Sequence, residues 1–191
     1  QRKGCHLMKI RVIVPCYNEG EVVLKTYDKL TEIMKKDSLI KNYEYDLLFI
    51  NDGSTDTTIH HIKNIVAYDN HVKYLSFSRN FGKEAAMIAG YQHSTMHDAV
   101  IMIDGDLQHP PEYIPQMIEG YIEGYDQVVA KRNRQGENFV RKTLSRCYYK
   151  LINAFVEDIQ FEDGVGDFRL LSRRAVQALT TLDEYNRFSK G

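Results

Sequence analysis

Residues 99–111 read Ala-Val-Ile-Met-Ile-Asp-Gly-Asp-Leu-Gln-His-Pro-Pro, an apolar run that leads directly into two acidic residues. The apolar part, 99–103, predicts a strand buried on both faces. Asp104 and Asp106 follow with one glycine between them, and the two prolines suit the first turn of a helix. A buried strand, a polar loop and a helix in this order are typical of an α/β fold.

The same unit recurs along the chain. Short apolar runs rich in β-branched residues predict strands over 9–14, 45–50, 72–77, 99–103, 127–130 and 168–171. Apolar spacing of three and four residues predicts helices over 19–36, 55–67, 83–94, 112–122, 139–155 and 173–182. Ser54 or Thr55 is suited to cap the second helix. Strands that alternate with helices predict a Rossmann-like, mostly parallel sheet with helices on both faces, in a single domain.

Composition narrows the class of protein. The 191 residues fit one domain, and 43% hydrophobic and 27% charged residues are ordinary for a globular chain. A net charge of -1 gives no broad attraction to nucleic acid. The three widely spaced cysteines favour a reducing compartment. No apolar run approaches the ~18 residues that span a bilayer. Residues 1–7 are interpreted as a leader before a start at Met8; the domain is expected over 8–191, and the natural protein is expected to continue beyond it.

Polar side chains follow the first four predicted strands. They are Tyr17-Asn18-Glu19, Asp52, Arg79-Asn80, and the pair Asp104 and Asp106. The carboxyl ends of parallel strands meet at one edge of a sheet, where such folds bind ligands. We therefore expect the four clusters to converge.

The acidic pair is the most informative cluster. Two carboxylates with one residue between them can share a hard cation such as Mg²⁺ or Mn²⁺, which fills its remaining coordination positions with phosphate and water. A cation that bridges a diphosphate makes it a better leaving group. Taken alone, Asp-x-Asp is equally compatible with a solvated turn or a helix cap.

Three motifs in order resemble the family 2 glycosyltransferases with the GT-A fold. They are Pro15-Cys-Tyr-Asn-Glu19, Asn51-Asp-Gly-Ser-Thr-Asp56 and Asp104-Gly-Asp-Leu-Gln-His-Pro-Pro111. A later stretch, Gly166-Asp-Phe-Arg-Leu170, resembles the branch that transfers sugars to polyprenyl phosphate, namely bactoprenol glucosyltransferases and dolichol-phosphate mannose synthases. The resemblance runs from about Met8 to the last residues.

The resemblance implies roles for the residues of the donor side. Pro15, Tyr17 and Glu19 would line the nucleotide pocket, and Asp52 would hydrogen-bond the base, uracil. Asn51 stands where many relatives have aspartate, so base recognition is assigned to Asp52. The acidic pair would bind ribose and metal: Asp104 on the ribose and metal side, Asp106 as main metal ligand, Gln108 as a helper. The family implies inversion of the anomeric configuration in one displacement.

Lys83 and three residues further on are candidates for phosphate and acceptor. Lys83 stands at a predicted loop-to-helix junction, where it would either pair with a diphosphate or remain solvated. Arg132 and Arg169 are suited to hold an acceptor phosphate, because guanidinium matches its geometry. Asp167 is the candidate general base on the resemblance. A phosphate acceptor is already anionic, so Asp167 could instead only orient groups.

The leading hypothesis is a glycosyltransferase that moves a hexose or aminosugar from a UDP-sugar to a polyprenyl phosphate. Transfer to a sugar hydroxyl of a polysaccharide or glycolipid is an alternative, although the Gln-x-x-Arg-Trp motif of processive synthases is absent because the chain has no tryptophan. An inactive nucleotide-binding domain is another. A nicotinamide dehydrogenase is disfavoured because no Gly-x-Gly-x-x-Gly follows the first strand.

A lipid acceptor implies work at the cytoplasmic face of the cell membrane. The predicted basic helix over 140–150 would either lie near anionic lipid or pack on the sheet as a surface helix. We expect the 191-residue chain itself to be soluble, and a homo-oligomer is compatible with its sequence.

Overall fold

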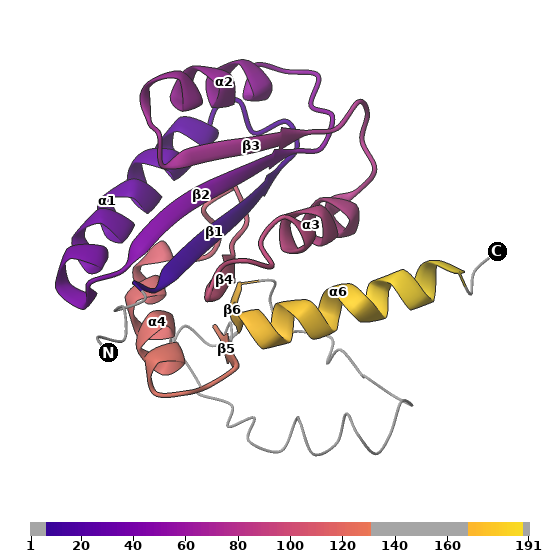
Figure 1. Ribbon diagram of the computed structural model, residues 1–191. Coiled ribbons are helices and arrows are strands. Elements are labelled where there is room, and N and C mark those ends of the chain that lie inside the picture. Colours follow the sequence, from indigo (N-terminus) through magenta and orange to yellow (C-terminus); the bar gives the residue numbers. More distant parts are fainter. Residues whose placement is uncertain (1–6, 131–167, 189–191) are drawn as a thin grey trace, which may run out of the picture.

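A single sheet organises the fold of the computed structural model, which describes residues 7–130 and 168–188, with side chains up to residue 181 (Figure 1). Within those residues the sheet has six strands in the order β3-β2-β1-β4-β6-β5. The strands are β1 (Lys9–Cys16), β2 (Glu44–Asn51), β3 (Val72–Ser76), β4 (Ala99–Met102), β5 (Gln127–Val129) and β6 (Arg169–Ser172). Every predicted strand is present, with ends that shift by no more than two residues.

The helices follow the strands as expected. They are α1 (Val23–Lys41), α2 (Thr58–Tyr68), α3 (Lys83–Gln92), α4 (Ile114–Ile122) and α6 (Arg173–Phe188), with a 3₁₀ turn at Pro111–Tyr113 before α4. The helix predicted over 139–155 lies outside the described residues. Among the described residues, no helix combines the length and apolar character needed to cross a bilayer.

Two helix starts differ from the prediction by three residues or more. α1 begins at Val23 and not at residue 19, because the backbone N–H groups of Glu19 and Gly20 donate to Thr58 Oγ1 (2.8 Å) and Asp56 Oδ2 (2.9 Å). These bonds hold the preceding residues as a loop. The predicted cap of α2 by Ser54 or Thr55 is wrong, because the helix starts at Thr58, whose N–H donates to Asp56 Oδ1 at 2.9 Å.

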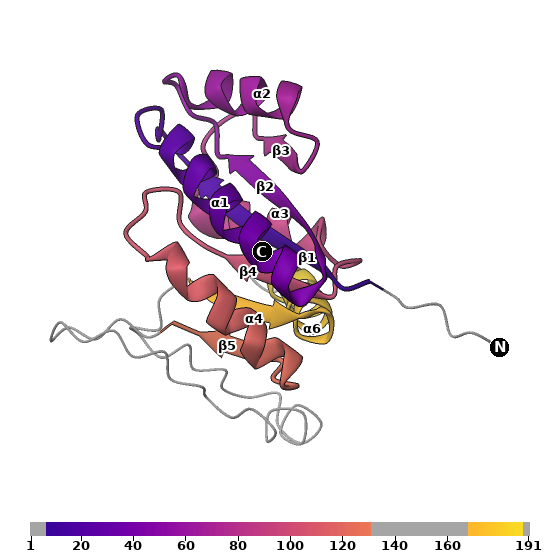
Figure 2. The same cartoon turned by 90° about the vertical axis from the view of Figure 1, so that its left-hand side faces the viewer.

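Helices cover both faces of the sheet, as predicted (Figures 1 and 2). On one face, Val12 and Val14 of β1 belong to a core that includes Leu30 of α1 and residues of α2 and α4. On the other face, Ile13 belongs to a second core with Ala86 of α3 and residues of α6. The alternation along β1 follows from the two-residue period of a strand.

Strand direction fixes where a ligand can bind. β1, β2, β3 and β4 are parallel, whereas β6 is antiparallel to both of its neighbours, β4 and β5. The sheet is therefore mostly parallel. β2 and β3 extend from one side of β1, and β4 lies on its other side. The order in which the chain adds strands to the sheet therefore reverses between β1 and β4. Open α/β sheets bind ligands at this switch point, beyond the carboxyl ends of the strands.

Candidate active site

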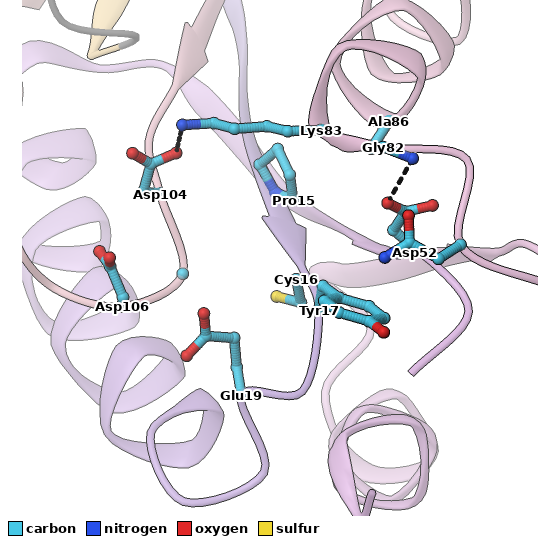
Figure 3. Close-up of a pocket in the computed structure, with 12 residues that line it drawn as sticks. Pro15, Cys16, Tyr17, Glu19, Asp52, Gly82, Lys83, Ala86, Asp104 and Asp106 are labelled. Carbon is cyan, nitrogen blue, oxygen red and sulfur yellow. Dashed lines mark hydrogen bonds and ion pairs between the residues drawn. The ribbon is translucent and has the colours of Figure 1, made fainter. Parts of the chain in front are cut away.

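A pocket of about 240 Å³ opens at the switch point (Figure 3). It is lined by Pro15, Cys16, Tyr17, Glu19, Asp52, Asn80, Gly82, Lys83, Ala86, Asp104, Gly105 and Asp106. These residues come from the ends of β1, β2 and β4 and the loops after them, from the segment that joins β3 to α3, and from the first turn of α3. The predicted convergence of four polar clusters is thus present.

One corner of the pocket gathers negative charge. The carboxylates of Glu19, Asp104 and Asp106 approach one another from two strand ends in Figure 3. Partial burial raises the pKa of Glu19, and the charges of Asp106, Asp56 and Asp104 raise it further. Mutual repulsion of this kind is relieved by a cation.

The chemistry of this corner fits a hard divalent ion with few protein ligands. All of its donors are carboxylate oxygens, which Mg²⁺ and Mn²⁺ prefer. In the described part of the chain, no three His, Cys, Asp or Glu side chains are arranged as a metal-binding group. Because its carboxylates line a pocket, the corner suits a cation that completes its coordination with phosphate and water, as Mg²⁺ commonly does with phosphate ligands.

Asp104 also contacts two basic side chains. Its Oδ1 lies 2.7 Å from Lys83 Nζ, and its Oδ2 lies 3.6 Å from His109 Nδ1. The His109 ring packs beside Phe168, with 5.7 Å between ring centroids. Lys83 thus faces the acidic corner, although the sequence places it 21 residues before Asp104.

Asp52 fixes the segment after β3. Its carboxylate is buried and accepts the backbone N–H groups of Phe81 (2.7 Å) and Gly82 (2.9 Å). Gly82 has φ 96°, and Gly53, with φ 65°, approaches the backbone of Arg79 so closely that a Cβ would lie 2.2 Å from its carbonyl carbon. Base recognition by Asp52 stays a prediction, and this anchoring is a role that the sequence did not reveal.

The loop after β1 is tied to the loop after β2. Besides the bonds of Glu19 and Gly20, the Asn18 N–H donates to Ser54 Oγ at 3.0 Å, and Asn18 Oδ1 accepts the N–H of Thr55 at 2.9 Å. Tyr17, the first residue after β1, is 45% exposed and forms one wall of the pocket.

Thr26 of α1 anchors the acidic loop, the segment after β4 that carries Asp104, Gly105 and Asp106. It is fully buried, and the shorter of its two side-chain hydrogen bonds runs to the Gly105 carbonyl at 2.7 Å. A side chain at Gly105 would be crowded, since a Cβ would lie 3.1 Å from Cys16 Sγ and from the Pro15 carbonyl oxygen. The sequence predicted no functional role for Thr26 or Cys16, because no local pattern places either residue at this loop.

Two further sequence candidates, Gln108 and Arg169, do not line the pocket. Gln108 is exposed and does not line the pocket, although its backbone N–H donates to Asp106 Oδ1 at 3.0 Å. Arg169 lies on β6, opposite Met102 of β4, and is also not a lining residue. Arg132 and Asp167 fall outside the described residues.

Comparison with known proteins decides the family. Residues 11–180 match the family model described as glycosyl transferase family 2. The chain belongs to glycosyl transferase family 2. It is therefore a glycosyltransferase, as the three motifs predicted.

Similar sequences in this family reach high identity. The chain is 54% identical over 182 residues to CsbB of Bacillus subtilis, which is named provisionally as a glycosyltransferase, covering 95% of this chain and 54% of that protein. It is 43% identical over 185 residues to the bactoprenol glucosyl transferase of Shigella phage SfX, covering 96% of this chain and 59% of that protein. The chain thus spans somewhat more than half the length of these curated relatives.

Solved structures of glycosyltransferases share the fold. Staphylococcus aureus TarS (residues 1–349) superimposes with a TM-score of 0.59 at 16% identity, over 90% of this chain and 49% of that chain. Glucosyl-3-phosphoglycerate synthase of Mycobacterium tuberculosis, solved with Mn²⁺, UDP-glucose and phosphoglyceric acid, gives 0.55 at 23% identity, over 87% and 57%. The predicted GT-A fold is confirmed.

Proposed function

We propose that this family 2 glycosyltransferase moves a hexose from a UDP-sugar to a polyprenyl phosphate with the help of Mg²⁺ or Mn²⁺. The proposal rests on the acidic corner at the switch point between β1 and β4. Its carboxylates offer oxygen ligands to a divalent cation, and the diphosphate of a nucleotide sugar would bind to the same cation. The name of the phage relative, a bactoprenol glucosyl transferase, supports the choice of acceptor.

The donor would occupy the pocket with its diphosphate toward the acidic corner. Asp106 and Asp104 would hold the cation, which neutralises charge on the departing diphosphate. Asp52 lies on the opposite side of the pocket in Figure 3, with Pro15 and Tyr17 between it and the acidic residues, and the space beside Asp52 is suited to the uracil base. A base on this side and a diphosphate on the other would span the pocket.

The acceptor needs little activation. A polyprenyl phosphate carries a negatively charged oxygen that can attack the anomeric carbon directly, so Asp167 would orient the acceptor and not take its proton. Attack from the face opposite the diphosphate inverts the anomeric configuration in one displacement. Arg132 and Arg169 would hold the acceptor phosphate through paired N–H donors.

The acceptor assay tests this proposal. The full-length protein with Mn²⁺ and UDP-glucose should glucosylate a polyprenyl phosphate with inverted configuration, detected by mass spectrometry and by NMR of the anomeric proton. The matched polyprenyl alcohol, which lacks the phosphate, should give no product. Transfer to an oligosaccharide hydroxyl in place of the lipid would contradict the proposed acceptor, and transfer without any divalent ion would contradict the proposed role of the metal.

Thr26 should prove to be a positioning residue for the acidic loop. Thr26→Val keeps the shape of the side chain but removes the donor to the buried Gly105 carbonyl, which costs about 1–3 kcal/mol when such an acceptor is left unpaired. We expect Mn²⁺-dependent UDP affinity to fall about two- to tenfold, which corresponds to roughly half of that cost appearing in binding. Thr26→Ser should restore the affinity because it keeps the hydroxyl. Calorimetric titration measures both, and equal affinities for the two variants would refute this role.

A further inference from the structure

The ion pair between Lys83 and Asp104 joins two elements of the pocket. Lys83 is the first residue of α3, and Asp104 follows β4; their charged groups are 2.7 Å apart. In Figure 3 the lysine stem crosses the pocket, and its ammonium ends beside Asp104, on the acidic side. A lysine in this position supplies the positive charge that a divalent ion would otherwise supply.

Resting on the proposed function, we propose that Lys83 is an exchangeable counter-ion. Without ligand it pairs with Asp104. When the cation and the nucleotide diphosphate bind, it leaves Asp104 and pairs with the diphosphate. Lys83 therefore opposes binding of the metal alone and favours binding of the nucleotide, so that the two ligands bind best together.

The root of Lys83 is held while its tip is mobile enough to exchange partners. The preceding Gly82 N–H donates to buried Asp52 at 2.9 Å, which fixes the start of α3. The Lys83 side chain is 45% exposed and carries its charge on a flexible four-carbon stem. The Asp104 side chain is only 19% exposed, so its charge needs a partner, and Lys83 can leave once a bound cation takes over that charge.

The surroundings of Asp104 explain why its charge has to be balanced. Glu19 and Asp106 lie on the same side of the pocket as Asp104. Burial raises the pKa of Glu19, and the charges of Asp106, Asp56 and Asp104 raise it further, which shows that like charges crowd this corner. His109 is a second basic group near Asp104, with 3.6 Å between its Nδ1 and Asp104 Oδ2. Removal of the Lys83 charge would leave this corner more negative and more attractive to a free cation. Removal of the Lys83 charge would also deprive the bound diphosphate of the lysine ammonium group as a partner.

Two titrations with opposite expected signs test the exchange. In Lys83→Met the stem is kept and the charge removed, so Mn²⁺ alone, followed by electron paramagnetic resonance, should bind about three- to tenfold more tightly than to the wild type. UDP titrated at saturating Mn²⁺ should bind about tenfold or more weakly. Lys83→Gln should shift both affinities in the same directions. The matched control, Lys63→Met, removes an exposed charge on α2 outside the pocket and should change neither affinity.

Each other outcome overturns the proposal. If Lys83→Met and Lys83→Gln bind Mn²⁺ as the wild type does, or more weakly, Lys83 does not compete with the metal. If they bind UDP normally at saturating Mn²⁺, it does not move to the diphosphate. Both results leave the proposed function intact. If the wild type itself binds no Mn²⁺, with or without UDP, the proposed function falls together with the exchange.

Discussion

Asp106→Asn should lower Mn²⁺-dependent UDP affinity at least about a hundredfold and reduce sugar transfer in parallel, a loss of about 2.7 kcal/mol. The amide keeps the size of the side chain and can still accept the Gln108 N–H, now 3.0 Å from Oδ1. It removes the charge that makes Asp106 a strong ligand for a hard cation. Calorimetric titration of UDP in the presence of Mn²⁺ measures the affinity.

Asp28→Asn is the matched control, because Asp28 is exposed on α1 and does not line the pocket. It should bind UDP as the wild type does. If Asp106→Asn retains wild-type affinity while its fold is intact, the acidic corner is not the metal site.

Asp46→Asn should destabilise the fold by about 3 kcal/mol, which corresponds to a fall in Tm of about 6–12 °C for a chain of this size. Asp46 and Arg11 are direct neighbours on β2 and β1, and the carboxylate accepts Arg11 Nε at 2.5 Å and Nη2 at 2.6 Å. Both side chains are largely buried, with exposures of 6% for Arg11 and 13% for Asp46. The amide would leave a buried guanidinium without its counter-charge. Urea denaturation measures the loss.

The difference in stability between the wild type and Asp46→Asn should depend on pH. Burial alone would raise the pKa of Asp46, but hydrogen bonds from Arg11 and His97 outweigh it and hold the pKa well below its usual value. A lowered pKa stabilises the fold above the pKa of an unfolded aspartate, about 4, and this contribution is lost as the pH falls below that value. The stability difference between wild type and Asp46→Asn should therefore shrink on acidification below pH 4. A difference that is under 1 kcal/mol at pH 7, or that grows with acid, would refute this account.

The sequence predicted those features that depend on local pattern. Apolar runs such as 99–103 predicted the strands, and the polar groups after them, Asp104 and Asp106 among them, predicted the edge at which the pocket lies. Because the carboxyl ends of parallel strands lie at the same edge of the sheet, polar residues that follow different strands come together in one pocket. The family motifs then supplied the activity.

Features that depend on contacts between distant residues could not be predicted in the same way. The start of α1 is set by hydrogen bonds to Asp56 and Thr58, 36 and 39 residues away from their partners. The pairing of Lys83 with Asp104 and the anchoring of the Phe81 and Gly82 N–H groups by Asp52 likewise join separate elements. No periodicity or motif encodes these partners, since each depends on how the chain packs in three dimensions.

Anomalous X-ray diffraction from crystals grown with UDP and Mn²⁺ tests the central claim most directly. We expect one manganese peak in the pocket, bound by the Asp106 carboxylate beside Asp104, with the diphosphate as its other partner and the base toward Asp52. Density for UDP elsewhere, or a pocket that holds neither manganese nor nucleotide while both aspartates face solvent, would contradict it.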